Sequence, residues 1–203
     1  MTKQPHTSAG GALSLERLVF FSDAVFAIAI TLLVLEIEVP HLPRVQDSAA
    51  FVEALRDLTP SFFAFGLSFL VIGRFWMTHH GLMDHVTTYD PRLMWPNMLY
   101  LMAIAFMPFS TALLGSNLGQ FGPALFYNLT LLVTALLGRL LVRKIEALDP
   151  TSETLGREAN GANSVMLGAG LSTLLTFVAP AFSQIGMATI PLWIRLLQRG
   201  VRK

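Results

Sequence analysis

The sequence predicts an all-α membrane protein whose chain crosses the bilayer six times. Only 13% of its 203 residues are charged, whereas a soluble globular domain usually carries about 25% charged residues. The mean hydropathy is correspondingly high, at +0.58. Apolar runs of about 20 residues, the length that a helix needs to cross the hydrocarbon core of a bilayer, recur along the whole chain. Neither an internal repeat nor a separate polar domain interrupts them, so we expect a single domain over residues 1–203.

Six segments reach or approach the spanning length. They cover residues 15–39, 59–79, 93–114, 121–141, 163–182 and 184–197. The first contains Asp23 and has no cleavage site of small residues in the expected place, which indicates a retained signal-anchor helix. Between the first two segments, Phe51, Val52 and Leu55 have the three- and four-residue spacing of a short amphipathic helix at the membrane interface. The sixth segment is short and contains Pro191.

The basic residues predict the orientation of these segments. With a cytoplasmic N-terminus, eleven Lys and Arg residues lie on the inner side of the membrane and two on the outer side. The inner ones are Lys3, Arg17, Arg92, Arg139, Arg143, Lys144, Arg157, Arg195, Arg199, Arg202 and Lys203, and the outer ones are Arg44 and Arg56. Because cytoplasmic loops carry an excess of basic residues, we expect a protein of the cell membrane with both ends in the cytoplasm. The cytoplasmic parts are then the polar N-terminus 1–13, the loop 144–160 and the basic tail 198–203.

Composition and motifs exclude several classes of function. The net charge is only +1 and no long basic run precedes the tail, so nothing indicates a nucleic-acid partner. The chain has no cysteine, which removes disulfides, thiolate metal sites and cysteine nucleophiles. A glycine-rich phosphate loop, a His-Glu-x-x-His motif and a nucleophile elbow are also missing. We therefore expect a protein that is not an enzyme and that has no cofactor and no resident metal.

A carboxylate inside the first membrane segment is the most informative single residue. A charge within a membrane helix costs several kcal/mol unless it is paired or hydrated, so Asp23 must face protein or water. Arg17 lies six residues earlier and does not share a helix face with Asp23. Candidate partners on the next two segments are Arg74, Trp76, His79, His80 and Asn97. Two interpretations remain open: a buried hydrogen-bond network that joins helices, or a proton relay between Asp23 and a histidine.

A second face of the same segment is apolar. Ile28, Leu32 and Leu35 fall within about 60° of one another on a helix. Phe21 extends this stripe toward the N-terminus, and Thr31 lies on its flank. Spacing alone is compatible with ordinary helix packing and with the lining of a pore.

Two carboxylates follow the stripe at the outer end of the segment. Glu36 and Glu38 are either charges that water solvates at the end of the helix, or carboxylates whose local field concentrates cations at a pore mouth.

Three stretches of the chain resemble one known family. The Arg-x-x-x-Phe-Ser-Asp motif at residues 17–23, with the apolar run that follows it to Glu36, resembles the hallmark of the transmembrane protein 175 family. The stretches Arg-Phe-Trp-Met-Thr-His-His-Gly at 74–81 and Met-Pro-Phe-Ser-Thr-Ala-Leu-Leu at 107–114 continue the resemblance. This family comprises the lysosomal-type potassium channels and their prokaryotic relatives. The resemblance covers the first three segments well, and the last three mainly by hydropathy and number.

The resemblance implies a function and a set of residues. Members have six helices per repeat and a pore lined by the first helix, and a single-repeat chain implies a homotetramer. The family's isoleucine and leucine constriction matches Ile28, Leu32 and Leu35, its pore threonine matches Thr31, and its packing motif matches Arg17, Ser22 and Asp23. We therefore expect a potassium-selective or potassium-preferring cation channel that has potassium ions and membrane lipid as its partners. The alternatives are a proton-conducting channel or proton-coupled transporter that uses Asp23 and the second-helix histidines, and a non-conducting membrane scaffold.

Overall fold

The computed structural model describes residues 8–40, 48–87, 89–148 and 155–201, and this part of the chain is helical, without a β-strand. The α-helices are α1 (Ser8–Leu32), α2 (Ser48–Asp57), α3 (Thr59–Met83), α4 (Met94–Ser116), α5 (Phe121–Leu148), α6 (Leu155–Thr176), α7 (Ile185–Ala188) and α8 (Ile190–Val201). The 3₁₀ helices are η1 (Leu33–Glu36), η2 (Pro91–Leu93) and η3 (Pro180–Phe182). The all-α class is therefore confirmed.

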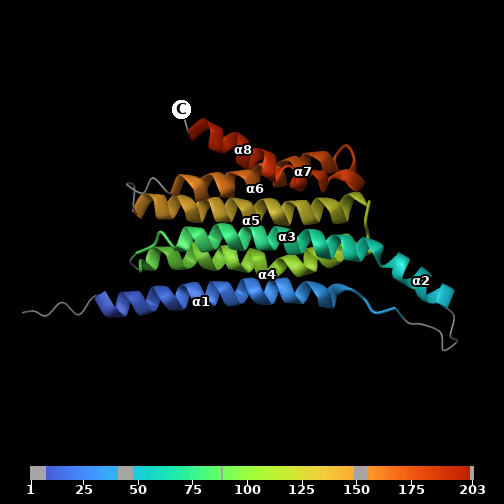
Figure 1. The fold of residues 1–203 in the computed structure, drawn as a ribbon, viewed down its shortest axis with the longest axis horizontal. Helices are drawn as coiled ribbons and strands as arrows, with labels where there is room; N and C mark the ends of the chain where they lie inside the picture. Colours follow the sequence, from blue (N-terminus) through green and yellow to red (C-terminus); the bar gives the residue numbers. More distant parts are fainter. Residues whose placement is uncertain (1–7, 41–47, 88, 149–154, 202–203) are drawn as a thin grey trace, which may run out of the picture.

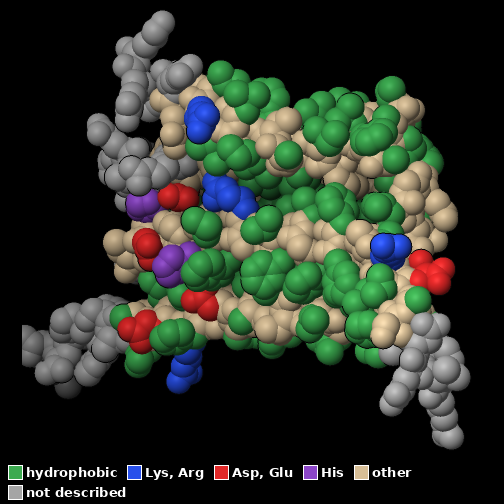
Figure 2. Space-filling view, turned by 45° about the vertical axis from the view of Figure 1, so that its right-hand side comes forward, with side chains coloured by type: hydrophobic (Ala, Val, Ile, Leu, Met, Phe, Trp, Pro, Cys, Tyr) green, Lys and Arg blue, Asp and Glu red, His purple; other side chains and the backbone are tan. Residues whose placement is uncertain are grey.

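The long helices run side by side, with α1 along one edge of the bundle and α8 along the other (Figure 1). Helix α4 packs against α1, α3 and α5, and α6 packs against α5, α7 and α8. The start of α1 and the end of α8 lie at the same end of the bundle (Figure 1). On the face shown in Figure 2, apolar side chains cover the middle, and charged side chains lie toward the two ends. This distribution suits a bundle that is embedded in a bilayer.

Four helices of the described part are long and apolar enough to cross a membrane. They cover Gly11–Glu36, Thr59–Met83, Pro91–Ser116 and Phe121–Glu146. The fifth predicted segment differs from the structure, because α6 begins at Leu155 and ends at Thr176, where we expected residues 163–182. The sixth, expected over residues 184–197, is divided into α7 and α8, and η3 lies at the end of the predicted fifth segment. Pro180 begins η3 and Pro191 is the second residue of α8, since proline lacks an N–H and fits only the first turn of a helix. Six crossings therefore stay a prediction.

The polar regions that the sequence analysis predicted to be cytoplasmic are more helical than expected. Helix α5 extends to Leu148 and α6 begins at Leu155, so most of the predicted loop 144–160 is helical. Arg139 Nη1 and Glu146 Oε2, 3.3 Å apart, form an ion pair along α5, and Arg, Lys, Glu and Ala all favour helix beyond the apolar run. The N-terminus is helical from Ser8, and the tail is helical to Val201. The remaining residues of these regions, 1–7, 149–154 and 202–203, lie outside the described part.

The turn from α3 to α4 is fixed by a carboxylate. Asp90 Oδ1 accepts a hydrogen bond from the backbone N–H of Arg92 at 2.8 Å, and Asp90 Oδ2 accepts one from Arg92 Nη2 at 2.7 Å. These bonds hold the pKa of the half-buried Asp90 carboxyl below its usual value. The carboxylate thus caps η2, and η2 leads directly into α4.

The predicted short amphipathic helix between the first two segments is present as α2. None of its residues is buried, and Phe51, Val52 and Leu55 are exposed. The helix projects beyond the bundle at the end where α3 begins (Figure 1). Its position at a membrane interface stays a prediction.

A buried polar cluster joins α3, the last turns of α4 and the first turns of α5. Thr111 Oγ1 lies 2.8 Å from Ser68 Oγ, and Ser68 Oγ lies 2.9 Å from the hydroxyl of Tyr127. Pro108 stands inside α4, and the hydroxyls of Ser110 and Thr111 both donate to the carbonyl of Met107 at 2.9 Å. Pro108 removes the N–H that would bond the carbonyl four residues earlier, that of Ile104, so these hydroxyl bonds to Met107 are additional bonds in the turn that follows the proline.

Candidate functional site

Helix α1 has one face that packs on the bundle and one that does not. The packed face carries small and apolar residues at three- and four-residue spacing together with one serine. Its buried members are Leu18, Ser22, Phe26 and Ala29, and Leu33 of η1 continues the stripe. This face lies against α3 and α4, so the rotation of α1 about its own axis is set by these contacts.

A chain of buried hydrogen bonds links the three helices. Ser22 Oγ donates to the carbonyl of Leu18 at 2.8 Å and accepts from Asn97 Nδ2 of α4 at 2.9 Å. The other end of the amide, Asn97 Oδ1, lies 2.8 Å from His79 Nε2 of α3. An amide oxygen only accepts, so His79 Nε2 carries the hydrogen in this arrangement. Ser22 and Asn97 are 0% exposed and His79 is 2% exposed, so this link is shielded from solvent.

The rim of the same junction holds Asp23. Its Oδ1 accepts a hydrogen bond from Trp76 Nε1 at 2.9 Å. The Trp76 ring stacks on His80 with centroids 5.4 Å apart, and the His79 ring stacks on Tyr100 at 5.7 Å. The carboxylate that needed a partner therefore has the indole of α3. Within the described part of the chain, no direct hydrogen bond joins Asp23 to a histidine.

The structure does not bring every motif residue into this network. Arg17 and Phe21 are exposed on α1, and Arg17 makes no hydrogen bond or ion pair in the described part of the chain. In the described residues Arg74 makes no hydrogen bond or ion pair with Asp23, and its Nη1 donates to Thr78 Oγ1 at 2.7 Å. The guanidinium lies against α6, where a side chain at Gly161 would come within 2.8 Å of Arg74 Nη2. Arg74 thus joins α3 to α6 and belongs to a separate contact.

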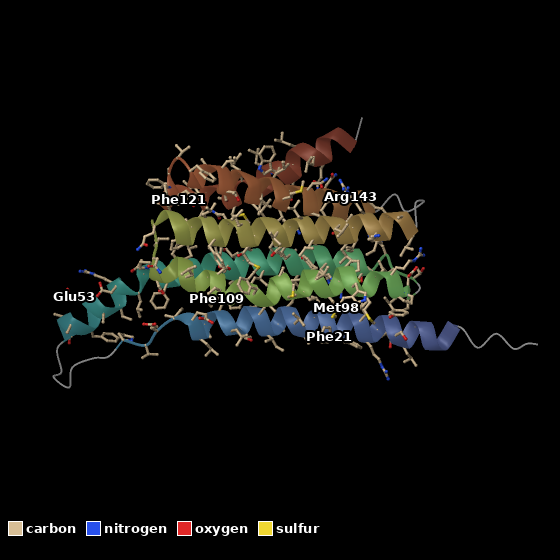
Figure 3. The ribbon with its side chains drawn as sticks, turned by 180° about the vertical axis from the view of Figure 1, so that it is seen from behind. Phe21, Glu53, Met98, Phe109, Phe121 and Arg143 are labelled. Carbon is tan, nitrogen blue, oxygen red and sulfur yellow. The ribbon has the colours of Figure 1, made fainter. Side chains whose placement is uncertain are left out.

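The free face of α1 is apolar. Ile28 is 58% exposed, Leu32 39% and Leu35 75%, and side chains project from α1 away from the bundle (Figure 3). Thr31 is exposed beside them, and its hydroxyl lies 3.0 Å and 2.9 Å from the carbonyl oxygens of Ala27 and Ile28. Because the hydroxyl hydrogen is used by the helix backbone, only oxygen lone pairs remain for another partner.

An acidic depression lies at the end of α1. Glu36 and Glu38 line an open cavity of about 430 Å³ together with Asp57, Asn117 and Gln120. Asp57, which ends α2, is a residue that the sequence analysis missed, although its position directly before α3 could have indicated it. No group of three or more His, Cys, Asp or Glu in the described residues is arranged to hold a metal ion.

Comparison with known proteins gives a consistent picture. The family model of the endosomal/lysosomal potassium channel TMEM175 matches residues 17–108. A potassium channel of Streptomyces collinus is 44% identical over 100 residues, which are 49% of this chain and 47% of that protein. The endosomal/lysosomal proton channel TMEM175 of Gallus gallus is 37% identical over 100 residues, 47% of this chain and 19% of that protein. The chain thus matches about half of the Streptomyces protein and a fifth of the chicken protein.

A solved structure is similar over nearly the whole chain. The crystal structure of a lysosomal potassium-selective channel TMEM175 homologue from Chamaesiphon minutus has a TM-score of 0.78 and 30% sequence identity. The similarity covers 90% of this chain and 97% of that one. Because the family model ends at residue 108, this coverage means that most of the chain beyond the family match also lies within the similar structure.

Proposed function

This chain belongs to the TMEM175 family, and from that premise we propose that it is a potassium channel whose subunits surround a pore lined by α1. The family consists of ion channels and not of enzymes. The names of the Streptomyces and Chamaesiphon relatives support potassium as the conducted ion. The exposed apolar face of α1 is the observation that carries the structural part of the proposal.

The two faces of α1 explain how such a pore would be built. In one subunit, Ser22 holds the packed face to α4, while Ile28, Leu32 and Leu35 contact little of their own chain. A homotetramer would place four copies of this face around one axis. Isoleucine and leucine side chains would then form a narrow apolar constriction, and such a ring can gate conduction by dewetting.

Three further features fit cation conduction through this constriction. Potassium sheds its hydration water more easily than sodium, so a tight apolar ring favours potassium. The Thr31 hydroxyl presents lone pairs, since its hydrogen is donated to the backbone, and lone pairs attract a cation. Glu36, Glu38 and Asp57 line one depression at the outer end, where their charge would raise the local cation concentration.

The proposed topology has six crossings with both chain ends in the cytoplasm. The start of α1 and the end of α8 lie at one end of the bundle (Figure 1), as an even number of crossings requires. Arg17, Arg92 and Arg143 belong to this end through α1, η2 and α5, whereas Arg56 of α2 belongs to the other. This asymmetry agrees with the excess of basic residues on the cytoplasmic side of membrane proteins and with a location in the cell membrane.

Flux of potassium and sodium into liposomes that contain the purified protein tests this proposal. Wild-type protein should pass potassium in preference to sodium, and Ile28→Asn should reduce that preference by wetting the constriction. Leu70→Asn is the matched control, because Leu70 of α3 is also exposed, at 73%, but lies on another helix. Unchanged selectivity in an assembled Ile28→Asn protein would show that α1 does not form the constriction.

Proton conduction is the second candidate, because the relative from Gallus gallus is named a proton channel and Asp23 is a titratable group on α1. Asp23→Asn separates the two functions. The amide keeps an oxygen that can accept from Trp76 but cannot carry a proton. Loss of proton flux with retained potassium flux would establish a proton path through Asp23. A folded tetramer that moves neither ion would leave the scaffold as the function.

A further inference from the structure

A second buried polar cluster lies where α6 ends and α7 begins. Its five side chains are at most 6% exposed: Asn128, Ser172, Thr176, Ser183 and Gln184. Asn128 Nδ2 lies 2.9 Å from Thr176 Oγ1 and 3.2 Å from both the Ser172 carbonyl oxygen and Ser183 Oγ. Gln184 Nε2 donates to Ser183 Oγ at 3.2 Å. The cluster therefore joins α5, α6 and the segment that leads into α7.

Three oxygen atoms of this cluster have no hydrogen-bond partner within the described part of the chain. They are Asn128 Oδ1, Ser172 Oγ and Gln184 Oε1. Turning either amide by 180° would replace an unpaired oxygen by an unpaired nitrogen, so it would not remove the deficit. Buried polar groups in native proteins almost always have a partner, and three unpaired oxygens in one cluster therefore indicate a bound molecule.

We propose that this cluster binds one ordered water molecule. Water offers two hydrogens and two lone pairs. It can donate to the amide oxygens of Asn128 and Gln184 and accept from the hydroxyl of Ser172, so its donors and acceptors match the three unpaired atoms. A sodium or potassium ion fits less well, because the cluster has no carboxylate and the amide hydrogens of Asn128 and Gln184 lie beside the free oxygens.

The packing around Ser172 limits the size of the bound molecule. A Cβ at Gly186 of α7 would collide with both the backbone and the hydroxyl of Ser172, so α6 and α7 approach very closely and Gly186 covers one side of that hydroxyl. A bound molecule can reach Ser172 Oγ only from another side, which limits it to a small one. The irregular backbone between Thr176 and Ile185 would be joined to α5 through the water, since non-helical segments inside a membrane protein need internal hydrogen-bond partners.

The sign of a stability change tests the proposal on the full-length protein in detergent. Ser172→Ala should lower the melting temperature by about 2–4 °C, because a bound water loses a donor and the amides lose part of their bridge. Gln184→Met should act in the same direction. Ser164→Ala is the matched control: Ser164 is equally buried on α6, and its hydroxyl donates to the Gly161 carbonyl of its own helix at 2.7 Å.

Two results would overturn the proposal. If Ser172→Ala melts at the same temperature as the wild type or higher, Ser172 Oγ has no bound partner, because removal of an unpaired buried oxygen is neutral or stabilising, whereas Ser164→Ala shows the cost of losing one bonded buried hydroxyl. If the wild type, but not Ser172→Ala, melts higher in sodium or potassium than in N-methylglucamine, the cluster holds a metal cation and not water.

Discussion

Replacement of Asn97 by leucine is the sharpest test of how α1 is held. Asn97 is fully buried and bonds two helices at once, Ser22 of α1 through Nδ2 and His79 of α3 through Oδ1. Leucine has the same number and branching of side-chain heavy atoms, so it removes both bonds without leaving a cavity. The substitution therefore separates hydrogen bonding from packing, which a change to alanine would not do.

The expected magnitude follows from the two bonds. Hydrogen bonds between membrane helices contribute about 0.6 kcal/mol each on average, so their loss costs about 1 kcal/mol. Ser22 keeps its bond to the Leu18 carbonyl, whereas His79 Nε2 is left unpaired in a buried site, which costs about 1–3 kcal/mol. The sum is about 2–4 kcal/mol. At about 2–4 °C per kcal/mol for a chain of this size, the melting temperature should fall by roughly 4–16 °C.

Thermal unfolding of the detergent-purified protein, followed by size-exclusion chromatography, measures this effect. Ser22→Ala, Asn97→Leu and the double variant form a mutant cycle. Because the two residues share one bond, the double variant should be less destabilised than the sum of the single variants, by about 0.5 kcal/mol or more. Strictly additive effects, or an Asn97→Leu protein that melts like the wild type, would refute the proposed link between α1 and α4.

Three other predictions concern separate parts of the chain. Glu36→Gln combined with Glu38→Gln should reduce potassium conductance at about 0.01 M salt and leave it unchanged at about 1 M salt, since salt screens the field of exposed carboxylates; an equal loss in single-channel recordings at both salt concentrations would contradict this. Tyr127→Phe should cost about 0.5–1.5 kcal/mol of unfolding free energy, because only the bond to Ser68 is lost; no fall in the melting temperature would show that this bond contributes nothing. Gly186→Ala should cost about 1–3 kcal/mol through its clash with α6, measured in the same melting assay, where tolerance of alanine would disprove the close approach.

The sequence predicted the first four long helices well, because each contains an apolar run close to the spanning length. It also predicted that Asp23 needs a partner from another helix. It could not identify Trp76 as that partner or pair Asn97 with both Ser22 and His79. These pairs depend on how far α3 and α4 are rotated and shifted against α1, and periodicity within one helix contains no such information.

The second half of the chain was predicted less well, for a related reason. A charge inside an apolar run indicates directly that a partner is needed. Asn128 and Ser172 are neutral and lower the hydropathy of their segments only slightly, so hydropathy does not identify them. Their importance appears only when α5, α6 and α7 are brought together. The helix ends were misplaced for a different reason, since Arg139 and Glu146 pair along α5 and continue the helix beyond the apolar run.

The hydrogen-bond network and the exposed stripe of α1 are connected by helix geometry. Ser22 and Ile28 are six residues apart, so they lie about 120° apart around α1 and about 9 Å apart along its axis. A rotation that broke the Ser22–Asn97 bond would turn Ile28 by the same angle. In the proposed tetramer every subunit carries the same substitution. One change at the network would therefore turn all four apolar faces that form the constriction. Variants of Ser22 or Asn97 that still assemble should therefore change ion selectivity as well as stability, although neither residue lies on the exposed face.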